Sequence, residues 1–207
     1  MKLLIAAQGL LDRSRAAEDL APLLMRLYLA PVFWMAGMQK AMNFPDTVQW
    51  FGDMMYGLGL PFPTLMAFLA TATELAGAVA LVLGLGLRWM CIPLMVTMLV
   101  AIFTVHLPHG WLAIAEGMGP FATERTMLAL ERLAEAKAIL REHGDYEHLT
   151  EYGSLVILNN GIEFAATYFI MLLSLFFTGG GRYVSLDGWL RRRIQGNPAL
   201  VSVQATN

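Results

Sequence analysis

The sequence has little charge and almost no cysteine, and each shortage excludes a class of protein. Charged residues make up 14% of the 207 residues, whereas hydrophobic residues make up 57%, and the mean hydropathy is +0.55. Such a composition excludes an ordinary soluble domain. The net charge of −2 gives no indication of nucleic-acid binding. Cys91 is the only cysteine, so an intrachain disulfide and a CxxC redox pair are both excluded.

The sequence instead contains several long apolar segments. A membrane-spanning helix needs about 20 consecutive apolar residues, and four segments qualify, at roughly 20–42, 64–87, 89–107 and 155–178. The sequence therefore predicts an all-α protein, a four-helix transmembrane bundle forming a single membrane domain over residues 1–192. Residues 1–15 are interpreted as a retained lead-in and residues 193–207 as a C-terminal tail.

Basic residues near the spans predict the orientation of the bundle. They precede the first span, occupy the turn between the second and third, and follow the fourth: Lys2, Arg13, Arg15, Arg88, Arg182, Arg191, Arg192 and Arg193. The loop over 108–154 instead carries eight acids against four bases. We therefore expect a bacterial inner-membrane protein with both termini in the cytoplasm and with the loops 43–63 and 108–154 outside.

The long outer loop contains a helical pattern of its own. Over residues 124–142, apolar side chains recur near one face, and Gly144 follows as a stop signal. The residues of this face are Met127, Leu130, Leu133, Ala134 and Leu140. The pattern predicts an extra amphipathic helix that covers the bundle or docks another membrane or periplasmic subunit.

Two carboxylates interrupt the apolar spans, Glu74 in the second and Glu163 in the fourth. Ionisable groups at membrane depth face a protein interior or a polar cavity and usually mark a functional site. At 1.5 Å per residue, both are expected about 12–15 Å below the outer surface. Lys40 and His106 end the first and third spans on the same side. The sequence thus predicts a polar pocket in the outer half of the bundle.

Helical neighbours indicate which way the two carboxylates point, because residues at i±3 and i±4 share a face. Those of Glu74 are small, which is typical of close helix packing in lipid, and those of Glu163 include Asn159 and Asn160. Either glutamate could instead be a neutral hydrogen-bonding pin between helices, and Lys40 could extend to the headgroups. Arg26 is interpreted as a snorkelling or helix-pairing residue.

These residues resemble the DoxX family of four-span bacterial membrane proteins. The motifs that carry the resemblance are Arg26-Leu27-Tyr28-Leu29-Ala30, Phe33, Gly37-Met38-Gln39-Lys40, Gly59-Leu60-Pro61, Glu74-Leu75-Ala76-Gly77, Leu83-Gly84-Leu85-Gly86-Leu87-Arg88, Pro93, Met98, Ala101, His106, Gly110, Gly179-Gly180-Gly181-Arg182-Tyr183 and Ser185-Leu186-Asp187. Two features depart from the family pattern, namely the length of the 108–154 loop and Val184 as an insertion. The resemblance implies links to thiosulfate:quinone oxidoreduction, to oxidative-stress membrane complexes or to metal handling.

The first functional hypothesis is a membrane subunit of a quinone-linked oxidoreductase system. Glu74 and Glu163 would act as the catalytic proton-transfer groups. The headgroup would be bound by Lys40, Glu74, His106, Asn159, Asn160 and Glu163. Because the sequence has no haem or iron–sulfur ligation pattern, electrons would come from another subunit.

Two alternatives stay open at this point. Imidazole and carboxylate ligands suit copper or another first-row metal, and the candidate ligands are His106, His109, Glu74 and Glu163. The chain could also be a noncatalytic subunit or assembly factor of a larger membrane complex that docks through the helix over 124–142.

Overall fold

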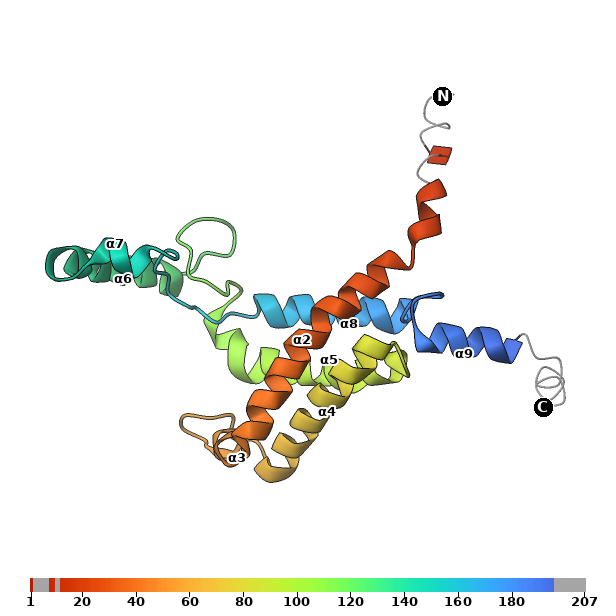
Figure 1. Ribbon diagram of the computed structural model, residues 1–207. Helices are drawn as coiled ribbons and strands as arrows, with labels where there is room; N and C mark the ends of the chain where they lie inside the picture. The colour runs from red at the N-terminus through yellow and green to blue at the C-terminus, as the bar shows by residue number, and fades with distance from the viewer. Residues whose placement is uncertain (2–7, 10–11, 196–207) are drawn as a thin grey trace. The chain divides into compact units, whose positions relative to one another are not determined.

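The computed structural model describes residues 1, 8–9 and 12–195, and their regular structure is helical (Figure 1). Parts of the predicted lead-in (2–7, 10–11) and of the predicted tail (196–207) lie outside these residues. The principal helices are α2 (Leu20–Met42), α3 (Phe44–Gly52), α4 (Pro63–Leu83), α5 (Leu87–Ala101), α6 (Glu124–His143), α7 (Tyr146–Thr150), α8 (Glu163–Thr178) and α9 (Leu186–Gln195). Within the described residues no strand forms beyond an isolated bridge between Ile114 and Leu158.

The predicted fold class, an all-helical membrane bundle, is confirmed. In the described part of the chain, three helices are long and apolar enough to cross a membrane: Leu20–Met42, Pro63–Leu83 and Leu87–His109. The last of these continues α5 through a π-helical segment, Ile102–His106, and a 3₁₀ turn, Leu107–His109. The fourth helix, α8, is apolar but has only 16 residues, which corresponds to about 24 Å.

The chain divides into two compact units, residues 1–97 with 169–207 and residues 98–168. In the first unit the fully buried apolar side chains come from α2, α4, α5 and α8, and they include Leu29, Phe33, Leu81, Cys91, Leu94, Leu172 and Leu175. Side chains from four helices thus share one core. In lipid such a core is held by packing rather than by a hydrophobic driving force.

The turn between α4 and α5 begins earlier than expected. Gly84 ends α4 in the left-handed conformation, with φ of 63°, as glycine commonly does at the end of a helix. A Cβ atom at this position would lie 2.6 Å from Ser185 Cβ and 2.7 Å from Arg26 Cζ. The span predicted over 64–87 therefore stops at Leu83, and Leu87 already belongs to α5.

The helix predicted over 155–178 begins only at Glu163, so that prediction is wrong for residues 155–162. This segment is not helical because its backbone pairs with the segment 110–115. The N–H groups of Asn159 and Gly161, for example, donate to the carbonyls of Ala113 and Leu112. Asn160 is left-handed, with φ of 61°, and asparagine and glycine are weak helix formers. Glu163 consequently lies in the first turn of α8, not eight residues inside a span.

The predicted helix in the outer loop is confirmed as α6, but its buried face is shifted. Leu130, Leu133 and Leu140 are half-buried, as expected. Met127 is 47% exposed, however, and Thr126 is fully buried in its place. Thr126 turns inward because it forms a capping box with Thr123, the N-cap residue. The inner stripe therefore begins at Thr126, so the prediction that Met127 lies on the buried face is wrong.

Candidate functional site

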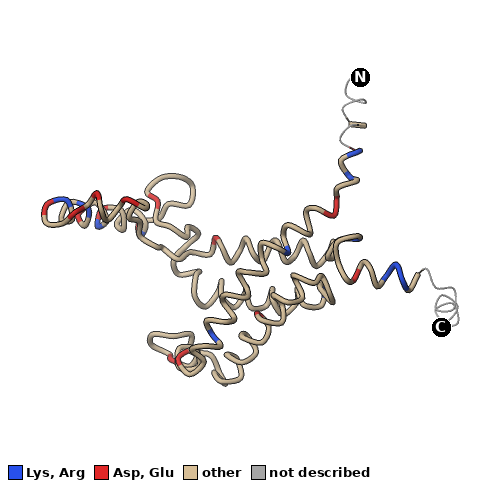
Figure 2. Tube along the Cα trace, viewed as in Figure 1, with Lys and Arg blue, Asp and Glu red and all other residues tan. Residues whose placement is uncertain are grey.

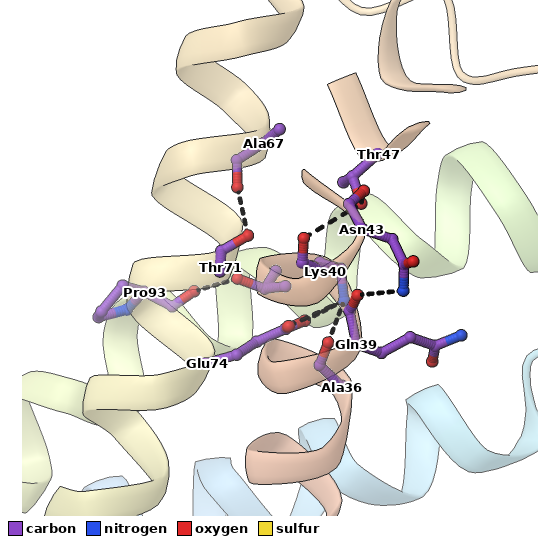
Figure 3. Close-up of polar contacts among 10 residues, drawn as sticks. Ala36, Gln39, Lys40, Asn43, Thr47, Ala67, Thr71, Glu74 and Pro93 are labelled. Carbon is purple, nitrogen blue, oxygen red and sulfur yellow. Dashed lines mark hydrogen bonds and ion pairs between the residues drawn. The ribbon is translucent and has the colours of Figure 1, made fainter. Parts of the chain in front are cut away.

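A charged pair joins α2 to α4 inside the first unit. Lys40 Nζ lies 2.9 Å from Glu74 Oε1 and 2.8 Å from Glu74 Oε2, so the ammonium donates to both carboxylate oxygens (Figure 3). The Glu74 side chain is 3% exposed, and that of Lys40 is 24% exposed. A buried carboxylate is tolerated when a cation and hydrogen bonds compensate for its lost hydration. Glu74 thus faces a neighbouring helix, and Lys40 pairs with it.

The pair forms because α2 and α4 approach closely at Gly37. A Cβ atom at Gly37 would lie 2.9 Å from Leu75 Cγ and 3.2 Å from Glu74 Cβ. Small residues allow such backbone approach between membrane helices. Because Gly37 and Lys40 are three residues apart on one helical face, the close approach brings the lysine within reach of Glu74.

A cavity of about 360 Å³ lies beside Lys40, within the first unit. Its lining residues come from the end of α2, from α3 and from the link between them: Gln39, Lys40, Asn43, Asp46, Thr47 and Trp50. Residues that carry amide, hydroxyl, carboxylate, ammonium and indole groups therefore line one space. Lys40 belongs both to this lining and to the pair with Glu74, so one member of the pair also lines the cavity.

Side-chain hydrogen bonds fix the rim of the cavity. Asn43 Nδ2 donates to Gln39 O at 3.0 Å, and Thr47 Oγ1 donates to Asn43 O at 3.0 Å (Figure 3). Both bonds join residues four positions apart. They bridge the junction at which α2 ends and α3 begins. They therefore stabilise the position of α3 relative to the end of α2, and these two segments line the cavity.

A tight turn follows α3. The Asp53 carboxylate accepts hydrogen bonds from the backbone N–H groups of Met55, at 2.7 Å, and Tyr56, at 3.0 Å. The bond from Tyr56, and then that from Met55, lowers the pKa of Asp53, because both stabilise the charged carboxylate. The Asp53 carboxylate therefore stays charged to a lower pH than a free aspartate would, and it continues to accept both backbone hydrogen bonds of the turn.

A second polar cluster lies in the unit of residues 98–168. His106 Nδ1 is 2.9 Å and His109 Nδ1 is 3.2 Å from the backbone carbonyl oxygen of Asn160. A carbonyl oxygen only accepts hydrogen bonds, so both rings carry a proton on Nδ1. His106 ends the π-helical segment that continues α5, and such segments often occur at functional sites.

Asn159 and Glu163 complete this second cluster. The Asn159 amide donates to His109 O at 2.8 Å and to Leu112 O at 2.6 Å, and its oxygen accepts from Arg125 Nε at 3.1 Å. Glu163 Oε2 accepts the Ala113 N–H at 2.9 Å. These contacts join the start of α8 to the end of the third span. The prediction that Asn159 and Asn160 share a helical face with Glu163 is therefore wrong, because both asparagines precede α8.

The structure thus brings the predicted site residues together in two groups. Lys40 and Glu74 form the first, and His106, Asn159, Asn160 and Glu163 belong to the second, with His109. The estimate that Glu163 lies deep in a helix is wrong, because α8 starts at this residue. The hypothesis that both groups line one pocket stays a prediction. Among the described residues, no three His, Cys, Asp or Glu side chains are grouped to hold a metal ion.

The sequence interpretation missed the contribution of α3. Asn43, Asp46, Thr47 and Trp50 line the cavity, although the segment containing them was expected only to be an outer loop. The sequence does contain a signal for α3, because Pro45 comes two residues after Asn43 and proline is favoured in the first turn of a helix. A short polar helix directly after a span was the feature to recognise.

Arg26 proves to be a helix-pairing residue, and it does not snorkel. Its side chain is 1% exposed. It donates to the carbonyls of Leu81 at 2.7 Å, Val82 at 2.8 Å, Gly180 at 2.6 Å and Val184 at 3.0 Å. The carbonyls of Leu81 and Val82 belong to the last turn of α4, where backbone carbonyls have no N–H donor within the helix. The guanidinium therefore fastens the end of α4 to the chain after α8.

Comparison with known proteins yields one family. The DoxX family profile matches residues 21–107. "Putative oxidoreductase CatD" of Bacillus subtilis is 32% identical over 98 residues, which are 47% of this chain and 69% of that protein. "Inner membrane protein YphA" of Escherichia coli is 30% identical over 105 residues, 51% of this chain and 71% of that protein. No solved structure matches the chain.

Proposed function

Because this chain belongs to the DoxX family of membrane proteins, we propose that it is the membrane subunit of a quinone-linked oxidoreductase system. The proposed headgroup site is the cavity beside the Lys40–Glu74 pair. The observation that carries the proposal is the Lys40–Glu74 pair itself, because Lys40 also lines a cavity of about 360 Å³. A relative that carries the name "Putative oxidoreductase CatD" supports the same class of chemistry.

The residues of the cavity suit a quinone headgroup. Its two carbonyl oxygens need hydrogen-bond donors, and Lys40, Gln39 and Asn43 carry donor groups in the lining. Its ring needs a flat apolar surface, which the Trp50 indole offers. Its isoprenoid tail needs lipid or apolar helix surface, and α2 and α4 are apolar spans. Ligand sites of this kind combine apolar walls with a few placed polar groups.

The chain's own residues would bind the quinone and move protons. A bound quinone supplies the electron-accepting group, and its full reduction takes up two electrons and two protons. Lys40 would donate a hydrogen bond to a carbonyl oxygen, while Glu74 holds the ammonium in place and compensates its charge. The electrons would come from a separate redox protein, since one cysteine cannot supply an iron–sulfur ligand set.

A binding titration tests this proposal. Trp50 lines the cavity, so a short-chain quinone added to the purified protein should quench part of its tryptophan fluorescence, and Trp50→Phe should remove that part. Glu74→Gln should weaken binding about tenfold or more, because Lys40 loses its charged partner. Glu131→Gln, an exposed glutamate on α6, is the matched control and should leave the affinity unchanged. Equal affinities in the wild type and in Glu74→Gln would refute the site.

A second candidate function, a noncatalytic docking subunit, is favoured by the surface of α6. Met127, Leu128 and Ile139 are 47%, 43% and 59% exposed. A partner that covered them together would bury an apolar surface of the kind that marks interaction sites. If α6 docks another subunit, Met127→Glu with Ile139→Glu should abolish co-purification from native membranes. Arg132→Glu, at an exposed polar position, should not. A wild-type pattern in the double variant would exclude docking through this surface.

We also propose that the protein lies in the bacterial inner membrane with both termini in the cytoplasm. The basic residues that flank the spans support this orientation, and a relative is named as an inner-membrane protein. A green fluorescent protein fused after Asn207 should fluoresce, because it folds in the cytoplasm and stays dark after export through the general secretion pathway. A dark fusion at normal expression would reverse the proposed orientation.

A further inference from the structure

Helix α9 is hydrogen-bonded to the turn that joins two membrane spans, α4 and α5. The Asp187 carboxylate accepts the backbone N–H groups of Gly86, at 2.8 Å, and Leu87, at 3.1 Å. The Asp187 N–H donates to Gly84 O at 3.0 Å. These partners form the turn between α4 and α5, both of which are long apolar helices. Since a turn between two spans lies at a membrane surface, α9 begins at the level of the lipid headgroups.

The apolar residues of α9 share one face of the helix. Leu186, Trp189, Leu190 and Ile194 follow the spacing i, i+3, i+4, i+8. Their side chains are between 40% and 48% exposed, so the described part of the chain leaves this face partly uncovered. An uncovered apolar face at headgroup level is suited to the boundary between headgroups and acyl chains.

The charge of α9 is strongly positive. Arg191, Arg192 and Arg193 follow one another in its second half, and Figure 2 shows this part of α9 in blue. Asp187 is the only acid in the helix, and its carboxylate is occupied by the two backbone N–H groups of the α4–α5 turn. Three arginines are thus left without a carboxylate partner on their own helix.

Aromatic side chains accompany these arginines. The Arg193 guanidinium lies 4.8 Å from the centre of the Trp189 ring, and that of Arg192 lies 4.8 Å from the centre of the Tyr183 ring. Tryptophan and tyrosine are enriched at membrane interfaces, where one end of the side chain is apolar and the other is hydrated. Stacking on these rings directs the guanidinium groups along the helix surface, where lipid phosphates would lie.

We propose that α9 lies in the plane of the membrane surface and binds anionic phospholipids. The apolar face enters the acyl boundary, and Arg191 and Arg192 contact lipid phosphate groups. Arg193 lies on the apolar face beside Trp189, and its long side chain extends from there to the phosphates. The occupant is lipid, because the bonds to the α4–α5 turn hold α9 where headgroups are always present, and because arginine pairs well with phosphate. This proposal is independent of the quinone site.

A labelling experiment on the full chain tests the proposal. Cys91 is fully buried, and Cys91→Ala gives a background in which Leu190→Cys or Gln195→Cys carries one fluorescent label. Gln195 lies roughly opposite Leu190 on the helix. The labelled proteins are reconstituted in vesicles of phosphatidylcholine alone or of equal parts phosphatidylcholine and phosphatidylglycerol. Quenching by iodide then measures the exposure of each label to water.

In vesicles that contain phosphatidylglycerol, the label at position 190 should be shielded from iodide about tenfold better than the label at position 195. In vesicles of phosphatidylcholine alone, this difference between the two labels should be smaller. Replacing the three arginines by glutamine should remove the dependence of shielding on phosphatidylglycerol, because each arginine is expected to strengthen binding to anionic lipid about fivefold. Replacing them by lysine should keep most of it. Equal quenching at 190 and 195 in both vesicles would overturn the proposal. Shielding of position 190 that depends neither on the lipid charge nor on the arginines would also overturn the proposal. It would indicate that a protein partner or a second copy of the chain covers this face.

Discussion

Lys40 reaches from α2 to both carboxylate oxygens of Glu74 on α4, at 2.9 and 2.8 Å, and the same lysine lines a cavity. One residue therefore both compensates a buried charge and presents a proton donor to an open space. This double role is the basis of the proposed quinone site.

Removing one member of the pair should destabilise the protein more than removing both. Lys40→Met leaves Glu74 buried without a cation and should cost about 3 kcal/mol of unfolding free energy. Lys40→Met with Glu74→Gln removes both charges and should recover at least half of that loss. Thermal unfolding in detergent measures both variants. Equal destabilisation of the single and double variants would mean that the pairing contributes nothing.

Enlarging Gly37 should separate α2 from α4. Gly37→Val places atoms within about 3 Å of Leu75 and Glu74 and should cost about 1–3 kcal/mol. Quinone affinity should fall with it, because Lys40 moves away from Glu74. Met35→Val, on the same helix at a side chain that is 69% exposed, is the control. If Gly37→Val behaved like that control, close packing at Gly37 would not be what positions the pair.

Arg26→Lys should be strongly destabilising although it conserves charge. A lysine ammonium cannot reproduce the planar fork with which Arg26 contacts four carbonyl groups. Loss of charge-assisted hydrogen bonds of this kind costs about 2–3 kcal/mol. Arg15→Lys, at a side chain that is 79% exposed, should leave unfolding unchanged. Because Arg26 does not line the cavity, quinone affinity in the folded Arg26→Lys protein should be preserved.

Glu163→Gln distinguishes two roles for the second carboxylate. As an acceptor for the Ala113 N–H, glutamine would serve nearly as well as glutamate, so stability and quinone affinity should stay near wild type. Glu163→Ala should lower stability by about 1 kcal/mol, because the N–H loses its partner. A strong loss of quinone binding in Glu163→Gln would instead place this residue in the same pocket as Glu74.

The spans were predictable where apolar composition alone decides the structure. The first span was expected over 20–42, and α2 covers Leu20–Met42. The segment 155–162 is apolar apart from Asn159, Asn160 and Gly161, but its backbone pairs with residues 110–115, far away in the sequence. No local pattern encodes such a pairing. The fourth helix was therefore predicted with its first eight residues in the wrong conformation.

The candidate site was predictable in part. The small neighbours of Glu74 indicated that it faces another helix, and Lys40 was recognised at the right end of the first span. The sequence could not decide between pairing and snorkelling, because both place a lysine at a span end. The cavity depends on how α3 follows Asn43 and turns its side chains toward Lys40, and that geometry lies beyond helical periodicity.

Photoaffinity labelling tests the central claim most directly. The purified full chain is illuminated with a short-chain azido-quinone, and the modified residues are located by mass spectrometry. We expect labels within residues 39–50, which include the cavity lining. Unmodified quinone should compete with the labelling, and Glu74→Gln should reduce it. Labels confined to other parts of the chain, or labels that excess quinone does not displace, would contradict the proposed site beside Lys40 and Glu74.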